Sequence, residues 1–90
     1  MSPKLAQIGS YRFHFYMVDC AERTHVHIYV GGKPGKKQAK YWLSPQVELA
    51  WNRGFTTREL GEAESLVRAN ANYFKAVWNE KCGGTHGSED

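Results

Sequence analysis

Long apolar runs and closely spaced cysteines are missing from this sequence of 90 residues, and we expect no secretory leader. No stretch approaches the roughly 20 apolar residues of a membrane-spanning helix. The opening residues, MSPKLAQIG, have no apolar core of the kind that a signal peptide needs. We therefore expect a cytoplasmic protein with no membrane partner.

Cysteine is scarce, and its spacing excludes two common classes of site. Cys20 and Cys82 are the two cysteines, and they form no CxxC motif, so neither a zinc ribbon nor a thioredoxin-like site is predicted. Because the cytosol keeps thiols reduced, we expect the two cysteines to be free rather than joined in a disulfide.

The length leaves room for one hydrophobic core and none for a separate cofactor domain. Hydrophobic residues make up 41% of the chain, which is a globular composition and far from that of a disordered protein. We expect one domain over residues 1–82, a disordered tail over residues 83–90, and no cofactor.

Acidic residues are few in the first half of the chain. Residues 1–45 hold seven lysines and arginines against two acidic residues, a net charge of +5, whereas residues 46–90 hold five against seven, a net charge of −2. This asymmetry favours a polyanionic or acidic partner for the first half. The alternative is that the lysines serve solubility alone.

Alternating apolar and polar residues predict a sheet. Aromatic and β-branched residues, with turn residues at the boundaries, mark the strands. A lysine-rich loop, GGKPGKK, separates two of them. The predicted strands are Tyr11–Val18, Thr24–Val30 and Gln38–Leu43, with shorter ones at Lys4–Ile8 and Val47–Ala50.

The second half of the chain predicts one long helix from about Thr57 to Cys82. Thr56 and Glu59 form a T-x-x-E capping box, and Phe55 and Leu60 lie at the positions of a hydrophobic staple. Gly83-Gly84 is the expected C-cap. The apolar residues that recur every three or four positions between the two caps are Leu60, Ala63, Val67, Ala71, Phe74 and Trp78. The expected fold class is therefore α+β, with an antiparallel sheet of three to five strands packed on one long C-terminal helix.

The period of two assigns each strand residue to one of two faces. We expect the helix to cover the face of Phe13, Phe15, Met17, Val26, Ile28, Val30, Ala39, Tyr41 and Leu43. The opposite face would be open and would hold Arg12, His14, Tyr16, His25, His27, Tyr29, Gln38, Lys40 and Trp42.

Such an open face could bind RNA and could cleave it without a metal. His25 and His27 would lie about 6–7 Å apart on one strand, near enough to act as acid and base at one phosphate. Lys40 or Arg12 would hold the phosphate oxygens. The aromatic side chains would stack bases. The residues assigned to catalysis are His25, His27 and Lys40, and those assigned to binding are Arg12, Tyr16, Tyr29, Trp42, Lys36 and Lys37.

Three alternatives remain open for the same residues. The H-x-H pair with a third histidine resembles a metal site, which the carboxylates of Asp19 and Glu22 could complete, although the assignment adopted here contains no metal. Exposed aromatic residues beside arginine also suit a protein-docking surface without chemistry. Lastly, the histidines could be ordinary polar residues on a solvated face. Trp51 is expected in the core or over the helix start.

Several segments together resemble a family of small bacterial proteins known as a domain of unknown function. Its members show a P-H-V-H-V segment, an A-K-hydrophobic-W-L strand and N-x-G-F-[ST]-x-x-E-L before a helix. The matching segments here span about residues 5–81 and are IGSYRFHFYMVD, THVHIYV, AKYWLSP, VELAWNRGFTTRELGEAESLV and FKAVWNE.

The family is identified with DhiT, the toxin of a type II toxin–antitoxin pair, which implies a cognate antitoxin protein and a target in translation or nucleic acid. His25, His27, Lys40 and Trp42 match the family's segments, whereas His14 stands where an aromatic residue is usual. The leading hypothesis is a toxin-like protein that binds RNA or a ribonucleoprotein through this face, with cleavage of the RNA and a homodimer both left open. The alternative is a non-enzymatic protein that docks a protein or DNA partner.

Overall fold

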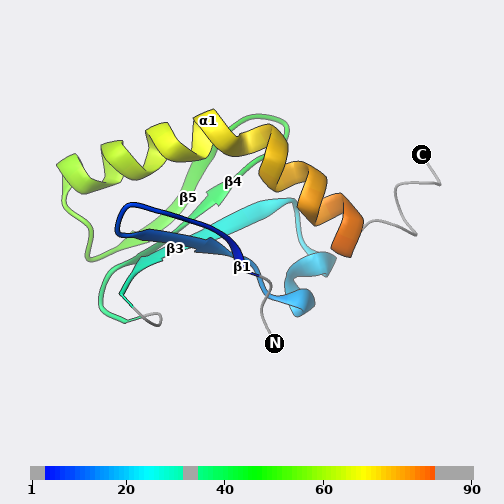
Figure 1. The fold of residues 1–90 in the computed structure, drawn as a ribbon, viewed down its shortest axis with the longest axis horizontal. Helices are drawn as coiled ribbons and strands as arrows, with labels where there is room; N and C mark the ends of the chain where they lie inside the picture. The colour runs from blue at the N-terminus through cyan, green and yellow to red at the C-terminus, as the bar shows by residue number, and fades with distance from the viewer. Residues whose placement is uncertain (1–3, 32–34, 83–90) are drawn as a thin grey trace.

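A computed structural model of the chain describes residues 4–31 and 35–82. Five antiparallel strands follow one another in chain order across the sheet, and one long helix lies along one of its faces (Figure 1). The α+β architecture expected from the sequence is therefore confirmed. The elements are β1 (Lys4–Ile8), β2 (Tyr11–His14), the 3-10 helix η1 (Met17–Ala21), β3 (His25–Val30), β4 (Gln38–Trp42), β5 (Glu48–Arg53) and α1 (Thr57–Lys81).

Two predictions from the sequence concern residues that the structure does not describe. The tail predicted at residues 83–90 and the C-cap at Gly83-Gly84 lie outside the described residues. Within residues 4–31 and 35–82, no helix is both long and apolar enough to cross a membrane.

Helix α1 begins where the capping box predicts. The Thr56 hydroxyl accepts a hydrogen bond from the Glu59 N–H at 3.1 Å, and the Glu59 carboxylate accepts one from the Thr56 N–H at 2.9 Å. The helix runs to Lys81, one residue short of the predicted end, and buries Ala63, Val67, Phe74 and Trp78. These four residues belong to the predicted periodic set, so the pattern identified the buried stripe of the helix.

Alanine at Thr56 is expected to lower the free energy of unfolding by about 1 kcal/mol, because the Glu59 N–H would lose its capping acceptor. Chemical denaturation of the variant measures this change. Thr57→Ala is the matched control, since Thr57 lies one residue inside the helix and is exposed. Equal destabilisation by both substitutions would contradict the capping role.

The core lies between α1 and the sheet, and it confirms most of the predicted buried face. Phe13 packs on Phe74 with ring centroids 5.2 Å apart, and Phe15 packs on Trp78 at 4.8 Å. Val30 is half-buried against this cluster, and the Met17 side chain is not among those described. The remaining buried members are Leu5, Val26, Ile28, Ala39, Tyr41, Leu43, Phe55, Ala63 and Val67.

The strand predicted at Tyr11–Val18 is wrong in its second half. Strand β2 ends at His14, and the chain turns into η1 at Met17. Asp19 explains the turn, because its carboxylate accepts a hydrogen bond from the Tyr16 N–H at 3.0 Å and its own N–H donates to the Tyr16 carbonyl at 2.8 Å. Such local bonds compete with a strand ladder. As a result, η1 lies beside one end of the sheet.

The prediction of free thiols is also wrong. Cys20 in η1 and Cys82 after α1 form a disulfide, with Cα atoms 5.3 Å apart and 62 positions between them in sequence. The end of α1 comes down beside η1, which brings the two cysteines together (Figure 1). The disulfide therefore ties η1 to the last turn of the helix.

Candidate functional site

The sheet face opposite α1 carries its side chains in rows, because antiparallel pairing aligns residues across the strands. The central row consists of His14, His27, Lys40 and Trp51, paired in that order from β2 to β5. On one side lies the outer row of Arg12, Tyr29, Gln38 and Arg53. On the other side lies the edge row of His25, Trp42 and Glu48. We call these three rows the polar face.

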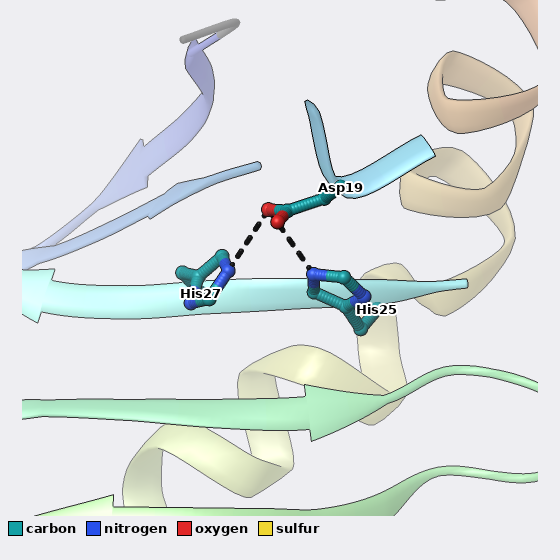
Figure 2. A group of neighbouring side chains, drawn as sticks. All are labelled: Asp19, His25 and His27. Atoms are coloured by element: carbon teal, nitrogen blue, oxygen red, sulfur yellow. Dashed lines mark hydrogen bonds and ion pairs between the residues drawn. The ribbon is translucent and has the colours of Figure 1, made fainter. Parts of the chain in front are cut away.

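The 3-10 helix η1 covers one part of the polar face. This part lies at the first residue of β3, His25, which belongs to the edge row. The Asp19 carboxylate lies over β3, and the rings of His25 and His27 point toward it (Figure 2). Asp19 Oδ2 is 3.0 Å from His27 Nε2 and 3.2 Å from His25 Nε2. One carboxylate oxygen thus meets both histidines, and we refer to these three residues as the Asp-His-His cluster.

His25 does not lie on an open surface as the sequence predicted. Its side chain is fully buried, and its ring lies 5.1 Å from that of Trp78 in α1 and 5.7 Å from that of Trp42. The position is the first residue of β3, where η1 and the end of α1 close over the strand. The alternation of residues along the strand assigned His25 to the correct row. It could not show that η1 and the end of α1 bury this residue.

The Asp-His-His cluster favours a charged carboxylate beside a neutral imidazole at His27. Burial alone would raise the pKa of Asp19, but the hydrogen bond from the Tyr16 N–H and the neighbouring His25 and His27 hold it below its usual value. Burial lowers the pKa of His27, and the adjacent His25 lowers it further, against the opposing effect of Asp19.

His14 was expected on the open face and is instead buried. Its ring stacks on that of His27 at 5.4 Å and meets those of Tyr16 and Tyr29 edge-on at 4.9 and 5.0 Å. Burial lowers the pKa of His14 to about 4, so the ring is neutral at pH 7. Among the described residues, its Nδ1 atom has no hydrogen-bond partner. His14 is thus a packed aromatic ring in this structure.

Trp42 in the edge row is flanked by two cations. The Arg23 guanidinium lies 4.6 Å from the centroid of its ring, and the Lys40 ammonium lies 4.5 Å from it. Each cation also has a carboxylate partner, Glu48 at 3.2 Å from Arg23 and Glu22 at 2.7 Å from Lys40. Glu22 is therefore paired with Lys40 and lies outside the Asp-His-His cluster.

Trp51 belongs to the polar face, and the prediction that placed it in the core or over the helix start is wrong. It pairs with Lys40 across the sheet, is 37% exposed, and lies 6.2 Å from the His27 ring. The Arg53 guanidinium lies 5.6 Å from its ring centroid. A β-bulge in the pairing of β4 with β5, after Lys40, determines which β5 side chains lie on the polar face. The alternation of apolar and polar residues in the sequence does not reveal such a bulge.

The fold places the remaining predicted binding residues in different parts of the molecule. Tyr16 is 39% exposed and sits 5.4 Å from the His27 ring, and Tyr29 and Arg12 are half-buried members of the outer row. Lys36 is exposed in the loop before β4. Lys37 bonds to Glu59 at 2.6 Å, which holds it at the start of α1 and away from the polar face.

Fold and site together define a small α+β domain in which the sheet face opposite α1 combines basic, aromatic and histidine side chains. The family model described as Domain of unknown function (DUF4160) matches residues 10–79, and the chain belongs to this family. The resemblance drawn from the motifs is confirmed at that level. Comparisons with curated proteins and with solved structures gave no match.

Proposed function

We propose that the chain binds single-stranded RNA on the polar face as the toxin-like member of a toxin–antitoxin pair. The observation that carries this proposal is the arrangement of Trp42 and Trp51 on the face that α1 leaves uncovered, each with a cation over its ring. Aromatic platforms with interleaved basic groups suit a single strand, whose unpaired bases stack while its phosphates meet the cations.

The register supports a path for the strand across the sheet. Trp51 lies in the central row opposite Lys40, and Trp42 lies two residues beyond Lys40 on β4, so the two rings flank one lysine. Guanidinium planes also stack bases, so Arg23 over Trp42 extends the platform. Each stacked base contributes roughly 1–3 kcal/mol.

Binding is better supported than cleavage. The acid–base hypothesis needs one phosphate to reach both His25 and His27, and the His25 side chain is fully buried under η1. His27 keeps 14% of its side chain exposed at the edge of the Asp-His-His cluster. The proposal therefore assigns RNA contact to the tryptophans and cations of the polar face.

The toxin role and its partner follow from the family resemblance. We propose a cognate antitoxin protein as partner and the cytoplasm as the place of action, where the RNA targets of translation lie. The positive charge of residues 1–45 suits both an acidic partner and RNA. An antitoxin that covered the polar face would compete with RNA for it.

The test is a titration of a fluorescent single-stranded 12-nucleotide RNA, followed by anisotropy at low salt, where phosphate contacts are strongest. Trp42→Ala and Trp51→Ala are each expected to weaken binding by roughly 5- to 150-fold, the equivalent of one stacked base. Tyr73→Ala is the matched control, because Tyr73 is an exposed aromatic residue of α1.

The salt dependence of RNA binding distinguishes the contribution of the cations from that of the aromatic residues. Arg23→Gln is expected to reduce the slope of log K against log salt by about 0.7 if Arg23 meets one phosphate. The proposal fails if wild-type protein binds no RNA at low salt, or if Tyr73→Ala weakens binding as much as Trp42→Ala. Growth inhibition by a wild-type protein that binds no RNA would favour a protein target.

A further inference from the structure

The ring of His25 poses a chemical problem that its protein neighbours do not solve. Its Nδ1 atom lies 2.7 Å from the carbonyl oxygen of Arg23. A carbonyl oxygen only accepts, so Nδ1 carries the proton and donates it. In the neutral ring, Nε2 therefore has a lone pair, and this atom faces Oδ2 of Asp19 at 3.2 Å.

Two electron-rich atoms facing each other in a buried place need a positive species between them. The approach of Nε2 to Asp19 lacks the geometry of a hydrogen bond, and within the described part of the chain Nε2 of His25 is a buried atom without a partner. Such an atom is costly unless something satisfies it. A proton or a metal ion would do so.

The donor atoms around this point match those of a metal centre. The cluster offers one carboxylate oxygen and two imidazole nitrogens, all within 4.8 Å of one another. The oxygen-to-nitrogen distances of 3.0 and 3.2 Å are close to the roughly 3.3 Å that separates two ligands on a tetrahedral zinc with bonds of about 2.0 Å.

We infer that Asp19, His25 and His27 form a binding site for one divalent first-row transition metal ion, with Zn²⁺ as its representative. Two imidazoles select this class over Mg²⁺ and Ca²⁺, which prefer oxygen ligands. The Arg23 carbonyl at Nδ1 of His25 is the outer partner that typically orients a metal-bound histidine. This inference goes beyond RNA binding and does not depend on it.

The fold holds the three ligands on two elements, β3 and η1, and the disulfide ties η1 to the end of α1. His25 and His27 come from β3, and Asp19 comes from η1, where the adjacent Cys20 is bonded to Cys82. Asp19 and His27 keep 12% and 14% of their side chains exposed, whereas His25 has none. A bound ion would therefore lie at the edge of the region where η1 covers β3, with one side toward the polar face.

The neighbouring candidates are excluded by position. His14 stacks on His27 but lies outside the group of converging donors, and Glu22 is bonded to Lys40. The third ligand is thus Asp19 rather than the third histidine of the sequence pattern. His14→Phe keeps an aromatic ring at this position and provides a matched control.

The experiment starts from full-length, tag-free protein freed of metal by a chelator and titrated with Zn²⁺ by calorimetry, with Mg²⁺ in parallel. Wild-type protein is expected to bind one Zn²⁺ per chain and to show no response to Mg²⁺. Asp19→Asn and His27→Gln are each expected to bind Zn²⁺ at least about 100-fold more weakly, since loss of an outer partner alone costs roughly 10- to 100-fold. His14→Phe should bind Zn²⁺ like the wild type.

Cobalt gives a readout on the wild-type protein that does not rely on any variant folding correctly. Co²⁺ at one equivalent is expected to produce visible absorption typical of few-coordinate nitrogen and oxygen ligation, which excess Zn²⁺ abolishes. Circular dichroism checks that each variant is folded. The inference is overturned if the wild type takes up no Zn²⁺, or if folded Asp19→Asn binds Zn²⁺ as tightly as the wild type. In that case a proton bridges His25 and Asp19.

Discussion

Serine at both Cys20 and Cys82 is expected to lower the free energy of unfolding by about 4 kcal/mol, one of the two largest effects on stability that the structure predicts. The bond joins residues 62 positions apart, so its removal restores the conformational freedom of a long loop in the unfolded chain. Against the roughly 5–15 kcal/mol of a typical domain, this is a large fraction. Urea denaturation under non-reducing conditions measures it.

A reductant supplies the control for the cysteine variant. Dithiothreitol should destabilise the wild type to about the level of the double serine variant and should leave that variant unchanged. Alkylation of free thiols in protein taken directly from cells reports the state of the pair where the protein acts. Equal stability of wild type and double serine variant, with and without reductant, would show that the disulfide contributes nothing to stability.

Alanine at Phe74 is expected to cost about 3–5 kcal/mol, the other large effect. Phe74 is fully buried in the C-terminal half of α1, where it packs on Phe13 of β2. Truncation leaves a cavity between helix and sheet that the surrounding side chains fill only in part. Thermal or urea denaturation gives the value.

The neighbouring residue provides a control for Phe74. Tyr73→Ala removes an aromatic ring of similar size from the same turn of α1, but Tyr73 is 53% exposed. It is expected to cost less than about 1 kcal/mol. A cost for Phe74→Ala no greater than that for Tyr73→Ala would contradict the position of the core between α1 and the sheet.

Local patterns predicted those parts of the fold that local interactions decide. The capping box of Thr56 and Glu59 located the start of α1, because both of its hydrogen bonds form within four residues. Alternation placed Phe13 and Phe15 toward the helix, because period two follows from the geometry of a strand. It also assigned His27 and Lys40 to one row, and the register pairs them.

Three features depended on information that period and composition do not carry. The bulge beside Lys40 placed Trp51 on the polar face. The proximity of Cys20 and Cys82 depended on the path of α1 over the sheet. The cover over His25 depended on η1, whose start at Met17 follows from hydrogen bonds that Asp19 makes to its own neighbours.

In the sequence, the strongest indication of the Asp-His-His cluster was the turn at Asp19. A carboxylate residue that interrupts an otherwise β-forming run indicates a turn, because its side chain can bond to neighbouring backbone groups. From the sequence, both Asp19 and Glu22 were candidates to complete a metal site with the histidines. The structure separates them, because Glu22 is bonded to Lys40.

The central claim is that Trp42 and Trp51 form the contact surface for single-stranded RNA, and the indole N–H signals of ¹⁵N-labelled protein test it most directly. The chain has three tryptophans, and Trp78 is buried in the core as an internal control. Addition of an unlabelled single-stranded RNA is expected to shift the signals of Trp42 and Trp51 and to leave that of Trp78 in place. Unmoved signals of Trp42 and Trp51 in excess RNA would contradict the account.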